Sequence, residues 1–405
     1  MRRKFIHELK GWPRLIWDRE RLAELLAAVR HRQGRLIGHM EALGFPLRQE
    51  AVLETLTSDV CKSSEIEGER LDAEQVRSSI ARRLGIDIAS LKRADRDVEG
   101  VVEMMLDATG RYSEPLTKER LFGWHASLFP AGRSGAKVRA GAWRDDAAGP
   151  MEVVSGPIGR ERVHFRAPAA SRLDGEMSAF LEWFNEGPEM DPVAKAGLAH
   201  LWFVTVHPFD DGNGRIARAI ADLALARSEG SSQRFYSMSA QIRQERGDYY
   251  DVLERTQQGT LDVTVWMEWF LGCLDRAVDG AQTMLGAVLA KARFWESVRD
   301  ITLNERQRLV LNRMLDGFEG KLTTSKYAKL AKCSQDTALR DVTALAEYGV
   351  LVRSEGGGRS TSYGLAYRVS LTERDSSRVA DSLENPPEPR EKLMTAAKAL
   401  AGGRE

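Results

Sequence analysis

The sequence predicts an all-α fold that carries one β-hairpin and ends in a smaller unit of helices and short strands. Three observations support this prediction. Apolar residues recur at helical spacing behind capping Asp residues, both in residues 1–90 and after residue 190. Two short β-prone runs flank a glycine-containing turn between Gly141 and Pro168. Beyond residue 300, short helical patterns are followed by brief apolar runs around a glycine-rich tip.

Composition narrows the class of protein. A chain of 405 residues is long enough for two or three domains, and 42% hydrophobic residues are enough for sizeable cores. The 59 Lys and Arg residues balance 59 Asp and Glu residues, so a general electrostatic attraction to nucleic acid or to a membrane is not indicated. Cys61, Cys273 and Cys333 show neither a disulfide framework nor zinc-binding spacing. Because no stretch is typical of a signal peptide or a membrane span, we expect a soluble, cytoplasmic protein.

The N-terminal region, residues 1–90, has the pattern of several helices. Asp18 is placed to cap a helix whose leucines and valine fall on one stripe. A second helix is predicted from about Gln49 towards Glu67, and Gly68 is placed to end it. Asp72 has the position of the next N-cap. We expect this region to form a small helical domain in front of a larger core.

The run from His207 to Arg218 concentrates the chemistry-bearing residues of the chain. Asp191-Pro192 has the pattern of an N-cap followed by a first-turn proline, so it starts an apolar helix that leads into the run. A second helix is predicted to start near Asn213. Its free backbone N–H groups and its dipole favour an anion, and Gly212 and Gly214 let the backbone approach one closely. The loop is therefore predicted to bind an anion.

The side chains of this run indicate phosphate chemistry. Arg215 and Arg218 are three residues apart, lie on one helical face and can both reach a polyphosphate. Asp211 is an oxygen ligand suited to a Mg²⁺ ion that bridges phosphates. His207 can accept a proton near neutral pH. Together these residue types indicate phosphoryl or nucleotidyl transfer.

The run matches the Fic-family motif His-x-Phe-x-Asp/Glu-Gly-Asn-Gly-Arg-x-x-Arg at every specified position, so the chain resembles Fic proteins. The resemblance implies that His207 deprotonates a target hydroxyl, which attacks the α-phosphate of ATP and takes up AMP. It also implies that Asp211 holds Mg²⁺ and that a buried Phe209 fixes the loop. The residues it places against the phosphates are Gly212, Asn213, Gly214, Arg215 and Arg218. Relatives that phosphorylate their targets carry lysine at the position of Gly214, and this difference favours AMP transfer.

The β-prone runs Met151 to Val154 and Val163 to Arg166 are predicted to form a hairpin. Fic cores carry such a hairpin, the flap, which pairs with a segment of the target by strand addition. The resemblance therefore implies that Val163, His164 and Phe165 dock the target. A plain surface hairpin remains the alternative.

Two positions downstream of the motif match the adenosine pocket of the family. The resemblance implies that Tyr249, the first of a tyrosine pair, and Gln257, eight positions later, line this pocket. Fic proteins more often have asparagine at the second position. The alternative is that Tyr249 and Tyr250 are core residues of an amphipathic helix.

Residues Ser63 to Gly68 match the Ser/Thr-x-x-x-Glu-Gly/Asn pattern of the Fic inhibitory helix, and they precede the motif as in one class of the family. The match implies that Glu67 pairs with Arg218 and occupies the place of the γ-phosphate. Ser63 lies one turn earlier on the same face, where it would steady the helix, and Gly68 completes the pattern. The alternative is an ordinary exposed helix end.

Residues 300–368 have the pattern of a separate unit behind a core of residues 91–295. Their predicted helices, β-prone runs and glycine-rich tip resemble a winged helix-turn-helix. Residues 321–370 hold eight Lys and Arg against four Asp and Glu, which favours phosphate contact. Winged helices also dock proteins, so DNA and protein both remain open as partners. Residues 369–405, which contain prolines among charges, are expected to be a linker and tail.

These observations predict a protein adenylyltransferase that moves AMP from ATP, with Mg²⁺, to a Ser, Thr or Tyr hydroxyl of a protein, itself included, and that is held back by Glu67. Two alternatives remain open. In the first, Glu67 positions a water that removes AMP from a modified protein. In the second, the core senses nucleotide and the winged helix binds DNA. Homodimers are common among Fic proteins, so the resemblance makes one an expectation here.

Overall fold

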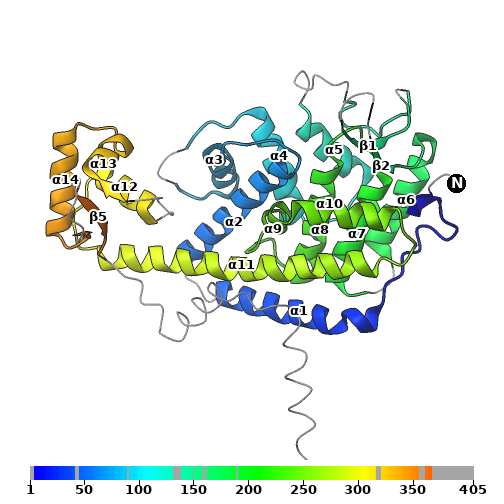
Figure 1. The fold of residues 1–405 in the computed structure, drawn as a ribbon, viewed down its shortest axis with the longest axis horizontal. Helices are drawn as coiled ribbons and strands as arrows, with labels where there is room; N and C mark the ends of the chain where they lie inside the picture. The colour runs from blue at the N-terminus through cyan, green and yellow to red at the C-terminus, as the bar shows by residue number, and fades with distance from the viewer. Residues whose placement is uncertain are drawn as a thin grey trace, which may run out of the picture. The chain divides into compact units, whose positions relative to one another are not determined.

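The computed structural model describes residues 4–366, apart from residues 42–44, 89–90, 131–137, 148, 157–159, 161, 188–189, 316–320 and 355–360. It divides into two compact units, Met1–Val288 and Leu289–Glu405 (Figure 1), each of which is described by itself. The first unit holds both the predicted N-terminal region and the greater part of the predicted core. Within the described ranges, no helix is long and apolar enough to cross a membrane.

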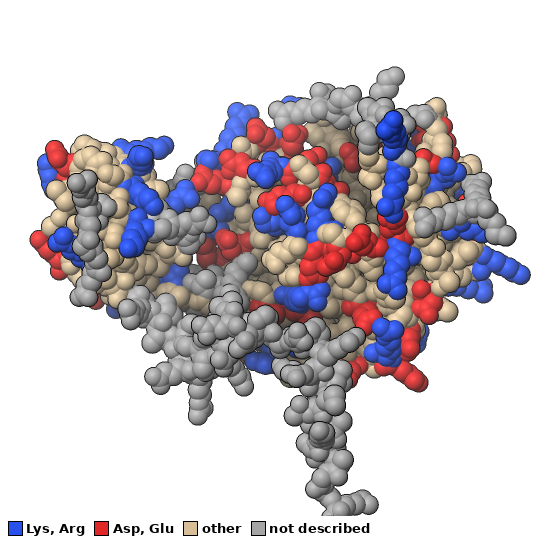
Figure 2. All heavy atoms as spheres, in the orientation of Figure 1, with Lys and Arg blue, Asp and Glu red and all other residues tan. Residues whose placement is uncertain are grey.

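The first unit is built from helices and one hairpin, as predicted. Its elements in chain order, with η for a 3-10 helix, are η1 (Ile6–Glu8), α1 (Arg19–Glu41), α2 (Phe45–Ile66), α3 (Ala73–Leu84), α4 (Arg96–Gly110), α5 (Lys118–Leu128), β1 (Glu152–Ser155), β2 (Arg162–Arg166), η2 (Ala170–Arg172), α6 (Leu173–Glu186), α7 (Pro192–Val206), α8 (Asn213–Glu229), α9 (Met238–Gln244), α10 (Arg246–Gln257) and α11 (Thr264–Ser297). The last residues of α11 belong to the second unit. On the visible face of the first unit, basic and acidic side chains are interspersed (Figure 2), in agreement with the formal net charge of zero.

Two of the predicted helix starts are confirmed at their capping residues, whereas α2 starts at Phe45, before the predicted Gln49. Asp72 caps α3 by accepting from the backbone N–H groups of Glu74 and Gln75. Asp191 caps α7 in the same way, and Pro192 occupies the first turn, where its missing N–H has no helical acceptor to bind. The side-chain oxygen of Gln75, on α3, accepts from the backbone N–H of Asp95. This hydrogen bond ties α3 to the start of α4.

Helices α7 and α8 pack side by side at the centre of the first unit (Figure 1). All residues of α7 from 196 to 206 are buried, as expected of a helix that is apolar all round. Helix α11 approaches it closely at Gly197, whose carbonyl accepts from Trp266 Nε1 at 2.8 Å. A Cβ at Gly197 would lie 2.9 Å from the ring of Phe270, so glycine permits this contact. The C-terminal end of α7, which leads into the predicted site, is therefore held rigidly.

The predicted hairpin is present as the antiparallel pair β1 and β2. Val153 lies opposite Phe165, and the register shifts between Val153 and Val154. Phe165 is 1% exposed, and its ring packs edge-on against Phe5 at a centroid distance of 5.2 Å. Burial of Phe165 fixes the base of the hairpin to the N-terminal segment.

The second unit contains helices and a small sheet. Its described elements after α11 are α12 (Glu305–Leu315), β3 (Leu322–Thr323), α13 (Thr324–Leu330), α14 (Gln335–Glu347), β4 (Leu351–Arg353) and β5 (Ser362–Leu365). The strands form an antiparallel sheet in the order β3-β5-β4. Asp341 lies within this unit and accepts from Arg306 Nε at 2.9 Å, Asn304 Nδ2 at 3.0 Å and Tyr327 Oη at 3.1 Å.

This order of helices and strands is the one expected of a winged helix, and that interpretation stays a prediction. The glycine-rich tip, residues 356–359, lies outside the described residues, as does the predicted linker and tail, residues 369–405.

Candidate active site

His207 lies at the C-terminal end of α7 with a φ of 50°, in the left-handed region. Its Nδ1 is 3.2 Å from the carbonyl oxygen of Val204. Because a carbonyl can only accept, Nδ1 carries the proton and Nε2 keeps its lone pair. Burial lowers the pKa of His207 to about 4. The side chain is therefore a neutral imidazole at neutral pH, with Nε2 available as a base.

The loop after His207 is held by two side chains from the motif itself. Phe209 is fully buried, and its ring stacks on the ring of His125 with centroids 4.1 Å apart. The side-chain amide of Asn213 donates to the carbonyl of Phe209 at 2.8 Å and accepts from its N–H at 3.0 Å. The Asn213 side chain thus closes the loop, and its backbone is the part left for the predicted phosphate cradle.

Arg144 also holds this loop, a role that the sequence did not reveal. Its Nε donates to the carbonyl of His207 at 2.8 Å, and its backbone N–H donates to the carbonyl of Pro208 at 3.0 Å. Nη2 donates to the carbonyl of Pro168 at 2.6 Å, and the side chain is fully buried. No periodicity or spacing connects Arg144 to the motif, which lies more than sixty residues downstream.

The carboxylate of Glu67 lies against the first turn of α8. A Cβ at Gly214 would be 2.1 Å from Glu67 Oε1 and 3.2 Å from Arg218 Nη1. Glycine at this position therefore makes room for the carboxylate. Gly212 precedes the helix with a φ of 78°, a conformation in which glycine carries no steric penalty. A negative charge at this helix end is favoured by the helix dipole.

Arg218 is bound by the two residues that the inhibitory pattern singled out. Its side chain is 1% exposed, and Nε donates to Ser63 Oγ at 2.9 Å. Nη2 donates to the carbonyl of Ser63 and to Glu67 Oε1, both at 2.8 Å. Nη1 is buried without a hydrogen-bond partner among the described residues. Since an unpaired buried donor is unfavourable, this guanidinium has unused capacity for an anion.

Arg215 faces a second carboxylate, which the sequence did not single out. Its Nη1 lies 2.6 Å from Glu69 Oε2, and its guanidinium stacks over the ring of Phe129 at 5.4 Å from the centroid. The side chain is 4% exposed, and its Nε is buried without a partner within the described part of the chain. Glu69 comes directly after the inhibitory pattern, so the pattern itself gave no signal for it.

A cavity of about 470 Å³ connects these groups, a size suited to a small-molecule ligand. Its lining includes Glu67, His164, His207, Gly214, Tyr249 and Gln257. The structure therefore brings the predicted base, the start of α8, the predicted inhibitory glutamate and the two predicted adenosine residues into one space.

Tyr249 and Gln257 are buried residues that also line the cavity. The hydroxyl of Tyr249 pairs with Nε2 of His200 at 2.9 Å, and burial lowers the pKa of His200 to about 3. Gln257 Nε2 donates to Thr205 Oγ1 at 3.2 Å. Tyr249 is thus both a buried core residue and part of the cavity wall, as the two interpretations of the sequence predicted. Its contact with adenosine stays a prediction.

The flap is tied to α10 at the rim of this cavity. His164 Nδ1 lies 2.6 Å from Glu254 Oε2, and His164 Nε2 lies 2.6 Å from Ser155 Oγ. These contacts link both strands of the hairpin to one carboxylate of α10. The hairpin is consequently held against α10 at the cavity, and its role as a flap stays a prediction.

The two flap strands differ in the state of their outer edges. On β2, the carbonyl of His164 accepts from Gln258 Nε2 at 2.6 Å, and the carbonyl of Arg166 accepts from His7 Nε2 at 2.8 Å. In the described sheet β1 pairs with β2 alone, so its outer edge has no partner strand there. Val163 is 38% exposed, whereas Phe165 is buried and supports the flap from within. Target docking through Val163, His164 and Phe165 stays a prediction, and the open edge belongs to β1.

Asp211 fits the predicted role of a Mg²⁺ ligand. The residue is exposed at the end of the loop, and its Oδ1 accepts from the N–H of Gly212 at 2.6 Å. Among the described residues, no group of three or more His, Cys, Asp or Glu side chains is placed to hold a metal by itself. Mg²⁺ is usually held by one or two carboxylates together with substrate phosphates, and a single carboxylate beside a phosphate cradle suits that arrangement.

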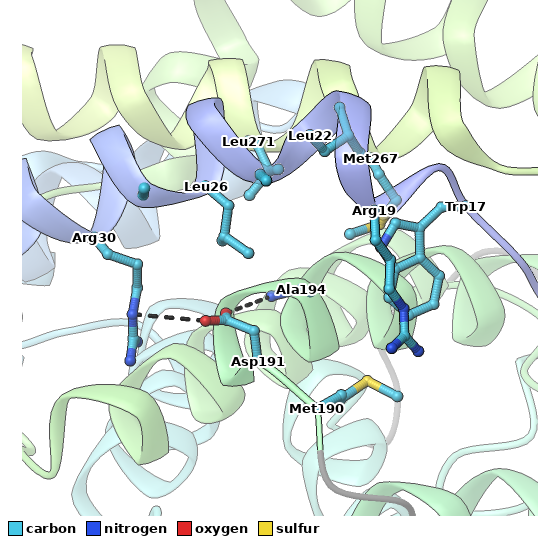
Figure 3. A pocket seen from close by; sticks show the side chains of 12 residues that line it. Trp17, Arg19, Leu22, Leu26, Arg30, Met190, Asp191, Ala194, Met267 and Leu271 are labelled. Carbon is cyan, nitrogen blue, oxygen red and sulfur yellow. Dashed lines mark hydrogen bonds and ion pairs between the residues drawn. The ribbon is translucent and has the colours of Figure 1, made fainter.

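A second cavity, of about 430 Å³, lies between α1, the start of α7 and α11 (Figure 3). Its walls include Leu22, Leu26, Met267 and Leu271, and Arg30 and Asp191 lie at one end with Nε and Oδ2 3.7 Å apart. The described residues that line it include no histidine, cysteine or serine and no residue of the motif. The predicted catalytic residue His207 lines the first cavity instead.

Comparison with protein families matches two stretches of the chain. Residues 115–225 match the Fic/DOC family. This stretch is similar to a Fic domain. Residues 5–86 match a family described as a domain of unknown function, DUF4172. The stretch that matches the Fic/DOC family includes the hairpin and the loop from His207 to Arg218, whereas Glu67 and Glu69 lie in the other matched stretch.

Curated relatives of the Fic domain are named Protein adenylyltransferase Fic. The protein of Nematostella vectensis is 33% identical over 114 residues, which are 28% of this chain and 25% of that protein. The protein of Culex quinquefasciatus is 32% identical over 114 residues, which are 28% of this chain and 21% of that protein. The similarity thus spans about a quarter of the length of these relatives.

A solved Fic family protein from Desulfovibrio desulfuricans G20 shares 22% sequence identity with this chain. The superposition covers 88% of this chain and 97% of that one, with a TM-score of 0.49.

Proposed function

We propose that this protein is an adenylyltransferase that moves AMP from ATP to a Ser, Thr or Tyr hydroxyl of a protein, itself included. The observation that carries the proposal is the shared cavity. His207, whose Nε2 is unprotonated, and Gly214 at the start of α8 both line it. The buried Arg215 and Arg218 follow Gly214 on α8 without lining the cavity, and each keeps one N–H group that has no partner among the described residues. The names of the curated relatives support the same activity.

The geometry suits a direct displacement. Nε2 of His207 takes the proton of the target hydroxyl while the hydroxyl oxygen forms a bond to the α-phosphorus of ATP. The bond from that phosphorus to the bridging oxygen breaks, and pyrophosphate leaves with the electron pair. Arg215, Arg218 and the N–H groups at the start of α8 stabilise the negative charge. Mg²⁺, held by Asp211, supplies further neutralisation of the phosphates when it is bound.

The remaining walls of the cavity fit the adenosine of ATP on one side and the target protein on the other. Tyr249 and Gln257 offer buried surface for adenosine beside the loop. The flap offers a docking strand for the target, with His164 at the cavity, an exposed Val163 next to it on β2, and an outer edge of β1 without a partner strand in the described sheet. Specificity for the target then depends on the surface around the flap.

We propose that the contact of Glu67 with Arg218 holds the enzyme in an inhibited state. Glu67 lies on Arg218 and directly over Gly214, where it takes the place of a phosphate group. ATP that binds beside this carboxylate cannot align its α-phosphate with the attacking oxygen. Release of Glu67 from Arg218 is therefore the step that activates transfer.

A second candidate function uses the same glutamate. Glu67 lines the cavity together with His207, and its side chain is 29% exposed. A carboxylate in this position can orient a water towards an AMP-modified side chain, and removal of AMP would follow. The two functions make opposite predictions for a Glu67 variant, as described in the Discussion.

The catalytic proposal is tested at His207. We expect His207→Ala to lower transfer of label from α-labelled ATP by about 10²–10⁴-fold, because no other base of the motif lines the cavity. Binding of ATP, measured by calorimetry, should change little. Transfer at the wild-type rate in this variant would contradict the mechanism.

The second unit is proposed as a docking module for DNA or for a protein. Arg340 is exposed on α14, and Arg353 is exposed on β4, while Arg359 lies outside the described residues. If the partner is DNA, Arg340→Ala should weaken binding at all sequences and reduce the salt slope of the affinity by about 1. Glu347→Gln, an exposed change on the same helix, is the matched control. Absence of salt-dependent DNA binding would leave protein as the partner.

A cytoplasmic location and a homodimer are further proposals. The cytoplasmic location follows from the cysteine pattern, and the homodimer follows from the frequency of homodimers among Fic proteins.

A further inference from the structure

The turn after α2 presents two carboxylates, one on each side of Gly68. The N–H of Gly68 donates to the carbonyl of Glu65 at 3.1 Å, and the N–H of Glu69 donates to the carbonyl of Ser64 at 3.0 Å. This pair of bonds is that of a Schellman C-cap. Gly68 has a φ of 90°, and nothing lies within 4 Å of a Cβ placed there. Glycine is therefore favoured at this position by the backbone conformation and not by close packing. The chain therefore reverses between Glu67 and Glu69.

The two carboxylates end on different arginines of the motif. Glu67 Oε1 lies 2.8 Å from Arg218 Nη2, and Glu69 Oε2 lies 2.6 Å from Arg215 Nη1. Each guanidinium also keeps one buried N–H group without a partner among the described residues, Nη1 of Arg218 and Nε of Arg215. Both arginines are thus buried cations whose carboxylate partner is a glutamate of this one turn.

We infer that Glu69 is a second inhibitory carboxylate, which occupies the anion position of Arg215 while Glu67 occupies that of Arg218. The inference rests on the proposed function. A polyphosphate at the start of α8 competes with Glu69 for Arg215, because two anions beside one guanidinium repel each other. Inhibition then consists of two contacts from one turn, and the known pattern, which ends at Gly68, describes only the first.

The exposed fractions of the two glutamates predict which glutamate–arginine contact is the stronger. The side chain of Glu67 is 29% exposed and that of Glu69 is 51% exposed, while those of the arginines are 1% and 4% exposed. Water and salt screen the more exposed pair more strongly. We therefore expect Glu69→Gln to raise polyphosphate affinity by about two- to fivefold, which is about 0.4–1 kcal/mol at about 1.36 kcal/mol per factor of ten. The effect of changing Glu67 should be larger.

The test is calorimetric titration of inorganic tripolyphosphate into the full chain, which requires no catalysis. Glu54→Gln is the matched control, because Glu54 lies on α2, which leads into the turn of Glu69, is 49% exposed and pairs with Arg77 at 3.1 Å. Glu69→Gln should bind tripolyphosphate about two- to fivefold more tightly than wild type, and Glu54→Gln should not differ from wild type. Equal affinities for the two variants, or no binding to any of them, would overturn the inference.

Two further measurements separate this inference from the proposed function. Arg215→Ala added to Glu69→Gln should remove the gain in affinity, since the freed arginine is its source. Self-modification from α-labelled ATP is followed for the same variants. If Glu69→Gln binds tripolyphosphate more tightly but no variant transfers AMP, Glu67→Gly included, the proposed function fails, while the assignment of Glu69 to the anion position of Arg215 stands. If AMP is transferred while Glu69→Gln behaves as Glu54→Gln in both assays, the inference fails and the proposed function stands.

Discussion

Two clusters of charged residues join α2 and α8, and they differ in how far water reaches them. The front cluster consists of Glu67, Glu69, Arg215 and Arg218. Its carboxylates are 29% and 51% exposed. The rear cluster consists of Asp59, Asp222, Glu229 and Arg234. The side chains of its last three members are only 2–3% exposed. The carboxylates of the front cluster are therefore accessible to water and to a competing ligand, whereas the side chains of Asp222, Glu229 and Arg234 are shielded from both.

The rear cluster contains more carboxyl groups than cations. Arg234 Nη2 donates to Asp222 Oδ1 at 3.0 Å, and its Nη1 lies 3.7 Å from Glu229 Oε1. Asp59 accepts from the N–H of Ser239 at 3.2 Å. Burial raises the pKa of Asp222 well above its ordinary value, and the nearby carboxylate of Asp59 raises it further. Asp222 therefore retains a proton over a wider pH range than an exposed aspartate.

The spacing along both helices shows how the clusters cooperate. On α2, Asp59 precedes Ser63 by one turn and Glu67 by two, and on α8, Arg218 precedes Asp222 by one turn. Asp59 thus anchors α2, one turn before Ser63, to Ser237 and Ser239 at the start of α9. We therefore expect α2 to stay in place when a ligand displaces Glu67 and Glu69 from their arginines.

The largest expected effect comes from breaking the rear cluster. Arg234→Met leaves buried carboxyl groups without their cation and should lower the free energy of unfolding by about 3–5 kcal/mol. Urea unfolding followed by tryptophan fluorescence reports on the first unit, because eight of the nine tryptophans lie in Met1–Val288. The control is Arg32→Met, which breaks the more exposed pair with Asp275 and should cost at most about 1 kcal/mol. Similar losses in both variants would remove the distinction between the clusters.

A smaller effect concerns the proton on Asp222. A carboxyl group whose pKa is raised in the folded state favours folding at low pH, and this contribution is lost as pH rises from the unfolded value of about 3.9 through the folded one. Asp222→Asn keeps an oxygen that can accept from Arg234 but does not titrate. Its stability relative to wild type should therefore be higher at pH 8 than at pH 5, as measured by urea unfolding at both pH values. A stability difference that is the same at both would show that Asp222 has no raised pKa.

Sequence was sufficient for the parts of the site that follow from local pattern. The caps at Asp72 and Asp191, the loop that begins at His207 and the pairing of Glu67 with Arg218 were all accessible from spacing or from the Fic motif. Each depends on residues within a few turns or on a pattern with fixed positions. The role of Phe209 as a buried anchor was accessible for the same reason.

Other contacts were not accessible because they join distant parts of the chain by geometry alone. Asp59 and Ser239 are 180 residues apart, and no periodicity relates them. Arg144 holds the His207 loop from outside the motif. The pairing of Glu69 with Arg215 depends on the direction of the chain after Gly68, which only the Schellman turn determines. The residues can be read from the sequence, but which of them are in contact depends on the three-dimensional fold.

The measurement that tests the central claim most directly is the rate of AMP transfer by Glu67→Gly. Loss of the carboxylate frees Arg218 for a phosphate group, and we expect transfer from α-labelled ATP to rise by more than about tenfold, since about 1.36 kcal/mol of improved alignment already gives that factor. Arg218→Ala in the same background should cancel the rise. Removal of AMP from a modified protein is measured in parallel, and its loss in Glu67→Gly without any rise in transfer would favour the second candidate function. Unchanged rates in both assays would contradict the account, because Glu67 would then be no more than the end of a helix.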